Sequence, residues 1–211
     1  MASSSSEISL PRPLFALALL YGGMTCTAGV LGSKQVGLGP LAVEAGIFPF
    51  LMLVALSSAV AELYGRATAD RLVRFGFIPL VTAIVLTWIV IQLPTDAGMW
   101  EPAKAAFPIV LGQSARLMVA GVISYGVSMT LNVLIFAKLA SAQGRLLAVR
   151  GAVASMLSQI VDTMIFITIG FAGVRPIGDL ILGQALAKVV LSIVLVPLLI
   201  TLFVKLAKRW A

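Results

Sequence analysis

Residues 138–176 read KLASAQGRLLAVRGAVASMLSQIVDTMIFITIGFAGVRP, and this stretch decides the class of protein. From position 151 to 174 it is uncharged apart from one acid, and it is long enough to cross a bilayer. Four polar residues in it have the spacing i, i+3, i+4, i+7 and so share one helix face: Ser155, Ser158, Gln159 and Asp162. Because a carboxylate near the bilayer centre is costly, it is rarely found there without a partner or a function. The pattern predicts a membrane helix whose polar face lines a path for a solute.

The composition extends this interpretation to the whole chain. Hydrophobic residues make up 60% of the 211 residues and charged residues only 11%, against about 25% charged residues in a typical soluble domain. Six apolar runs each supply the roughly 20 residues that a spanning helix needs. We therefore expect an all-α polytopic membrane protein, a single domain over residues 1–211, with six transmembrane helices in one bundle at about 13–33, 38–64, 75–95, 116–137, 150–173 and 177–204.

Basic residues between the expected helices predict the orientation of the chain. One side of the membrane receives ten of them: Arg12, Arg66, Arg71, Arg74, Lys138, Arg145, Arg150, Lys205, Lys208 and Arg209. The other side receives four: Lys34, Lys104, Arg116 and Arg175. Cytoplasmic loops carry the excess of Lys and Arg, so we expect both termini in the cytoplasm. The same bias accounts for the net charge of +7, and it favours a topological role over nucleic-acid binding.

Several kinds of chemistry are disfavoured by the residues that the chain lacks. It has no histidine and a single cysteine, Cys26, so it offers neither a His-based zinc site nor an intrachain disulfide. A Walker loop and a GxSxG motif are also missing from the sequence. We expect no enzymatic activity and no cofactor.

A second polar stripe lies in the run 116–137. Gly121, Ser124, Tyr125, Ser128 and Asn132 fall on one helix face. SMTLNVLIF, from Ser128, and SQIVDTMIF, from Ser158, also share a pattern at a spacing of 30, which indicates either a weak internal repeat or a chance match. The two stripes could meet across a shared interior. They could also serve only as hydrogen-bonded contacts between helices.

Four charged residues have two interpretations each. Glu62 is either an interior carboxylate or a helix-end acid paired with Arg66. Lys188 either pairs with an interior acid or extends toward the membrane surface. Arg116 and Arg150 open their helices at opposite faces, as interface anchors or as charges that reach the polar stripes.

Two segments outside the regular spans also have structural signals. Gly46 and Pro49 are expected to weaken or break the second helix. In residues 94–115, three prolines and Trp100 indicate an ordinary loop or a short interfacial helix that could cover a cavity.

Two motifs resemble those of the queuosine precursor transporters, also called the vitamin uptake transporter family. AGIFPFLMLVALSSAVAELYGRATAD, residues 45–70, is similar to the signature FP…(D/S)…E-x-YG…A, and SMLSQIVDTMIFITIGFAG, residues 155–173, is similar to S-x-x-S-Q-x-x-D-T-x-I-F…F-x-G. The resemblance runs from about Lys34 to the last helix. Ser58 and Asn132 depart from it, since many members have an acid at these positions.

The resemblance implies a six-helix protein of the bacterial inner membrane that imports 7-cyano-7-deazaguanine or 7-aminomethyl-7-deazaguanine. Such a guanine-like ring has two adjacent donors, which a carboxylate of Glu62 or Asp162 can accept. The complete set of substrate-binding candidates is Glu62, Asp162, Gln159, Asn132, Ser155, Ser158, Arg150, Arg116, Tyr125 and Phe166.

Two other functions fit the same sequence. The chain could be the substrate-binding subunit of an energised vitamin importer with a separate ATPase, or a membrane scaffold that transports nothing. Small residues on the helix faces make a homodimer possible.

Overall fold

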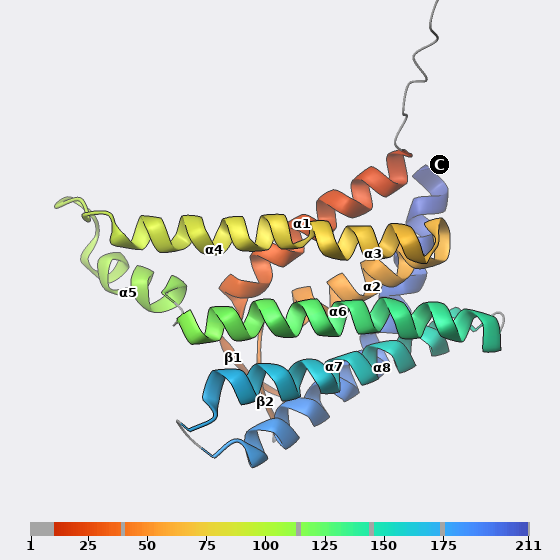
Figure 1. The fold of residues 1–211 in the computed structure, drawn as a ribbon. Coiled ribbons are helices and arrows are strands. Elements are labelled where there is room, and N and C mark those ends of the chain that lie inside the picture. The colour runs from red at the N-terminus through yellow and green to blue at the C-terminus, as the bar shows by residue number, and fades with distance from the viewer. Residues whose placement is uncertain (1–10, 39–40, 113–114, 144–145, 174–175, 211) are drawn as a thin grey trace, which may run out of the picture.

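The computed structural model describes residues 11–38, 41–112, 115–143, 146–173 and 176–210, and helices dominate these ranges (Figure 1). The order of elements is α1 (Arg12–Leu31), β1 (Gln35–Leu38), β2 (Leu41–Glu44), α2 (Ile47–Tyr64), α3 (Arg66–Phe75), α4 (Phe77–Gln92), α5 (Glu101–Leu111), α6 (Ala115–Gln143), α7 (Leu147–Phe171) and α8 (Gly178–Trp210).

The prediction of six membrane spans is confirmed. Within the described ranges, six helical segments are long and apolar enough to cross a membrane: Arg12–Leu31, Ile47–Tyr64, Arg66–Gln92, Arg116–Ala140, Leu147–Phe171 and Leu180–Trp210. The start of α1 and the end of α8 lie at the same end of the bundle (Figure 1). That this end is cytoplasmic stays a prediction from the basic residues, of which Arg145 and Arg175 lie outside the described residues.

The second span begins later than the expected residue 38, because a β-hairpin precedes it. β1 and β2 pair antiparallel, with Gln35 opposite Glu44. Gly46 ends the hairpin at a close approach to α1: a Cβ at this position would lie 2.8 Å from the carbonyl oxygen of Ala28 and 3.1 Å from the Cα of Gly32. The helix starts only at Ile47, directly after Gly46, and it continues through Pro49, which lies in its first turn and does not break it.

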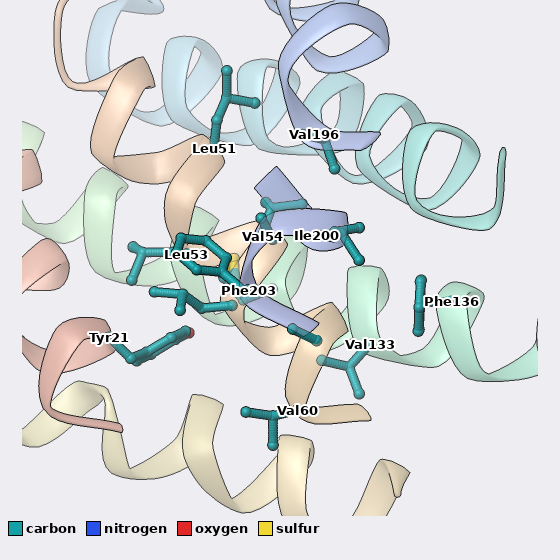
Figure 2. Close-up of a cluster of buried hydrophobic side chains, with 14 of the residues drawn as sticks. Tyr21, Leu51, Leu53, Val54, Val60, Val133, Phe136, Val196, Ile200 and Phe203 are labelled. Atoms are coloured by element: carbon teal, nitrogen blue, oxygen red, sulfur yellow. The ribbon is translucent and has the colours of Figure 1, made fainter. Parts of the chain in front are cut away.

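α2 is the centre of the bundle. Most of its residues from Leu51 to Val60 are completely buried, since α1, α6 and α8 surround it. Figure 2 shows Leu51, Leu53, Val54 and Val60 of α2 among side chains of those three helices, which include Tyr21, Phe136 and Ile200. This packing fixes the side of α2 that carries Ser57 and Ser58.

Glycines shape the third span. Gly65 has φ +81°, a conformation that favours glycine, and it turns the chain from α2 into α3. α3 and α4 then run as one nearly continuous rod past Gly76 (Figure 1). No residue of α4 is buried, so its apolar side chains are available to lipid.

The last three spans are α6, α7 and α8, which pack against one another in sequence order. α6 packs along α7, and α7 packs along α8, each pair antiparallel (Figure 1). The segment expected to be a loop or a short interfacial helix contains α5, which follows Trp100. The Trp100 side chain is exposed.

Candidate functional site

A cavity of about 490 Å³ lies inside the bundle. Residues of α1, α2, α4, α5, α6, α7, α8 and the hairpin line it. At one end the lining includes Ser33 and Gln35, which are exposed; at the other it reaches Gln159, which is completely buried. The cavity thus opens at the hairpin end, opposite the termini. Its volume lies within the roughly 300–1,000 Å³ of small-molecule pockets.

An ion pair forms part of the cavity wall. The Nζ of Lys188 lies 2.9 Å from Oδ2 of Asp162, and the hydroxyl of Ser128 donates to Oδ1 at 3.2 Å. The two charged side chains are only 11% and 6% exposed. Of the two sequence interpretations of Lys188, pairing with an interior acid is confirmed. The pair neutralises a carboxylate that would otherwise be costly at this depth.

Gln159 is the most unusual polar residue of the cavity. Its side chain is completely buried, and neither its Nε2 nor its Oε1 has a hydrogen-bond partner within the described structure. A buried donor or acceptor without a partner costs about 1–3 kcal/mol. Gln159 lies one helical turn from Asp162 on the same face of α7, so a ligand that reaches one of them also reaches the other.

Aromatic rings supply flat walls. Phe50, Tyr125, Phe166 and Phe171 line the cavity. Phe166 and Phe171 are in edge contact, with ring centroids 6.3 Å apart, and Phe77 packs edge-on against Tyr125 at 5.0 Å. These contacts fix the ring orientations, because edge-to-face pairs have a defined geometry. A planar ligand would find both apolar walls and a polar end.

Below the cavity, toward the termini, an amide joins two helices. The Nδ2 of Asn132 contacts the hydroxyls of Ser57 and Ser58 at 3.3 and 3.2 Å and the carbonyl oxygen of Val54 at 3.4 Å. Asn132 is completely buried and does not line the cavity. It therefore acts here as a contact between α6 and α2.

A second ion pair closes the same end. Arg150 lies 3.0 Å from Glu62 through its NH1, and its guanidinium stacks over Phe136 with the carbon 4.3 Å from the ring centroid. Its side chain is 5% exposed and that of Glu62 is 35% exposed. Arg150 is twelve residues from Asp162, which places the pair about 18 Å further along α7. Glu62 is therefore paired across the bundle, while Arg66 pairs with Asp70.

Two tyrosines close the gap between α1, α3 and α6. The hydroxyls of Tyr21 and Tyr125 lie 2.8 Å apart, and the Tyr125 hydroxyl donates to the carbonyl oxygen of Val73 at 3.3 Å. Gly76 allows this approach, because a Cβ there would lie 2.3 Å from the Tyr125 oxygen. Tyr125 thus has two roles: it lines the cavity, and its hydroxyl makes the contacts that close the base of the cavity.

The structure divides the predicted site residues into two groups. Gln159, Asp162, Tyr125 and Phe166 line the cavity. Six others do not: Glu62, Asn132, Ser155, Ser158, Arg150 and Arg116. Of these, Ser158 donates to the carbonyl oxygen of Ser155, and Arg116 donates to the carbonyl oxygens of Ile169 and Ala172 at the end of α7.

Two charged residues of the lining were not among the predicted site residues. Lys188 was recognisable as a lone charge in an apolar run. Glu44 lines the cavity because the hairpin, which the sequence did not predict, carries it to the mouth.

Comparisons with known proteins identify relatives of this chain. Residues 44–202 match the family described as "Putative vitamin uptake transporter". A protein of Bacillus subtilis (strain 168) named "Probable queuosine precursor transporter" is 24% identical over 187 residues, which cover 86% of this chain and 80% of the relative. No solved structure matches.

Proposed function

This chain belongs to the vitamin uptake transporter family, as its motifs suggested, and is a multi-pass transporter of the plasma membrane; we propose that its substrates are the queuosine precursors 7-cyano-7-deazaguanine and 7-aminomethyl-7-deazaguanine. The name of the Bacillus subtilis relative supports this substrate class. The observation that carries the proposal is Gln159: a buried amide with no partner among the described residues, in the wall of a cavity that is otherwise suited to a flat ring.

The polar end of the cavity suits the chemistry of such a substrate. A 7-deazaguanine has two adjacent donors, the ring N1–H and the 2-amino group, and Asp162 is an acceptor at the cavity wall. Gln159 adds one acceptor and two N–H donors that none of the described residues uses. A ligand that pairs with this amide removes the cost of burying it, which favours the bound state.

The apolar part of the cavity suits the ring faces. Phe50 and Phe166, from α2 and α7, provide surfaces on which a planar heterocycle can pack. Buried polar partners give strong discrimination, because an analogue that lacks the matching group leaves them unpaired.

The two ends of the cavity differ, and this difference defines the conformational state within the proposed transport cycle. The cavity opens at the hairpin end, while Asn132, the Tyr21–Tyr125 contact and the Glu62–Arg150 pair close the other. With cytoplasmic termini, this is an outward-facing state. Release into the cell then requires the Glu62–Arg150 pair to separate, as helices rock around the central site.

The direct test is the modification of tRNA in a bacterial strain that can neither make the precursor nor import it. When 7-cyano-7-deazaguanine is supplied, queuosine should accumulate in tRNA only when this protein is expressed. Queuosine without the protein, or no queuosine when the protein is abundant in the membrane, would contradict the proposal.

Uptake by the purified protein in liposomes separates transport from the alternative of a binding subunit. The transporter should accumulate radiolabelled precursor inside vesicles that contain no ATPase. Binding without entry would favour the subunit of an energised importer.

A further inference from the structure

Lys188 is the charged group of the cavity that the proposed function has not used. It lies on α8, opposite Asp162 of α7, and its ammonium is the only cation that the described residues contribute to the cavity wall. An ammonium has three N–H donors, and the described structure engages one of them, with Asp162. Two donors are therefore available next to the carboxylate.

Asp162 is likewise only partly occupied. A carboxylate accepts about four hydrogen bonds, and Ser128 and Lys188 account for two of them. Because the two contacts are on different oxygens, each oxygen keeps one accepting site. The pair thus offers two accepting sites and two N–H donors side by side.

The other hydroxyls of the cavity are already engaged. Thr25 donates to the carbonyl oxygen of Gly22 at 2.7 Å, and Ser124 donates to that of Gly121 at 3.2 Å. Tyr125 donates to the carbonyl oxygen of Val73. Among the buried or half-buried side chains that the described residues contribute to the cavity wall, Lys188 and Gln159 are the ones with N–H donors to spare.

We propose that Lys188 is a specificity-determining residue, which donates to the 6-oxo group of the substrate while Asp162 accepts from the ring N1–H and the 2-amino group. This inference rests on the proposed function. In a guanine-type ring these three groups are consecutive along one edge, in the order donor, donor, acceptor. The Asp162–Lys188 pair presents the complementary order, with its two kinds of group 2.9 Å apart.

The same pair rejects an adenine-type edge. Such a ring has an acceptor at N1 and an amino donor at position 6, so its N1 lone pair would face Asp162 and its amino group would face Lys188. Both contacts are repulsive, and both protein charges would lose their ligand hydrogen bonds. The site selects against this ring as well as for the other one.

The experiment compares two ligands that differ only at position 6. The probes are 7-cyano-7-deazaguanine and its 6-thio analogue, in which the weakly accepting sulfur replaces oxygen and N1–H is retained. Their dissociation constants are measured by calorimetry with protein purified in detergent. Wild-type protein should bind the oxo ligand roughly 10- to 100-fold more tightly, as expected for a hydrogen bond to a charged donor.

Substitution at Lys188 should remove this preference. In Lys188→Met the two ligands should bind with equal affinity, and Lys188→Arg should keep the preference because it keeps an N–H donor. Each protein gives one ratio, the dissociation constant of the thio ligand over that of the oxo ligand. The larger size of sulfur affects this ratio equally in every variant, so it cancels when the ratios of variant and wild type are compared. If Lys188→Met is poorly folded because Asp162 is left unpaired, the double variant Asp162→Asn, Lys188→Met removes both charges and should likewise show no preference for oxygen.

Results that contradict the role of Lys188 can be told apart from results that contradict the proposed function. A preference that survives in Lys188→Met, or in the folded double variant, overturns the assignment. A preference that is lost in Gln159→Leu while Lys188→Met retains it assigns the 6-oxo contact to Gln159 instead. If wild-type protein binds neither ligand, the proposed function fails, and the role of Lys188 fails with it.

Discussion

Replacing Gln159 with leucine should separate substrate binding from stability. In the part of the chain that the structure describes, the donor group and the acceptor of this amide have no partners, and each costs about 1–3 kcal/mol when buried. Gln159→Leu removes this cost at similar volume, so the free energy of unfolding without ligand should stay the same or rise by up to about 2 kcal/mol. The variant also lacks the amide that we propose pairs with the substrate. If that pairing contributes about 1–3 kcal/mol, the dissociation constant should rise roughly 5- to 150-fold.

Gln184 is the matched control for this experiment. It is another buried glutamine of the bundle, its Oε1 also lacks a partner in the described structure, and it does not line the cavity. Gln184→Leu should change stability in the same direction and leave the dissociation constant within about twofold, because residues remote from the ligand act independently of it.

Both variants can be measured with the same two assays. Thermal unfolding in detergent without ligand reports stability, and calorimetric titration with 7-cyano-7-deazaguanine reports affinity. The reasoning is refuted if Gln159→Leu binds as well as wild type, or if it unfolds at a markedly lower temperature. Equal losses of binding in the two variants would refute it too, since the effect would then not come from the cavity.

Three more predictions concern the elements around the cavity. Glu62→Gln should weaken the closure and raise thiol labelling of a cysteine placed at Ser155, measured from the terminal side in a Cys26→Ser background; unchanged labelling would argue against a gate at this pair. Gly76→Ala should cost about 1–3 kcal/mol, because its Cβ meets the tyrosine pair, whereas Gly23→Ala, with open space around it, should stabilise by up to about 1 kcal/mol in thermal unfolding. Arg116→Gln should lower stability by about 1 kcal/mol without changing substrate affinity, since the arginine caps the carbonyl end of α7; a change in titrated affinity would place it in the site.

The spans were predictable because hydrophobicity and helical spacing act along a single segment. Six apolar runs predicted six crossings, and the i, i+3, i+4, i+7 stripe predicted that Gln159 and Asp162 share a face. Both residues line the cavity. The hairpin was missed, since two strands of four residues leave too short a pattern to compete with the apolar run that follows.

Partners between distant segments were not predictable in the same way. Glu62 had a possible partner four residues away, Arg66, and the chain instead brings it to Arg150. The choice depends on how α2 packs against the later helices, which no local spacing encodes. Lys188 shows the opposite case. It is a lone cation in an apolar run, and Asp162 is the one acid that lies well inside an expected span, so the two form an ion pair.

The similar segments of α6 and α7 have different contacts in the structure. In the antiparallel pair, Ser128 of the first motif contacts Asp162 of the second, and the same register places Asn132 opposite Ser158. The second contact is not made: Ser158 donates within its own helix, and Asn132 turns to α2. The Nδ2 of Asn132 has two hydroxyls and a carbonyl oxygen as partners, while its Oδ1 has none within the described structure. A neutral amide can be buried in this way, whereas a carboxylate at that depth needs a cation. The difference between Asn132 and Asp162 therefore accounts for a closed contact below the cavity and a charged wall, completed by Lys188, within it.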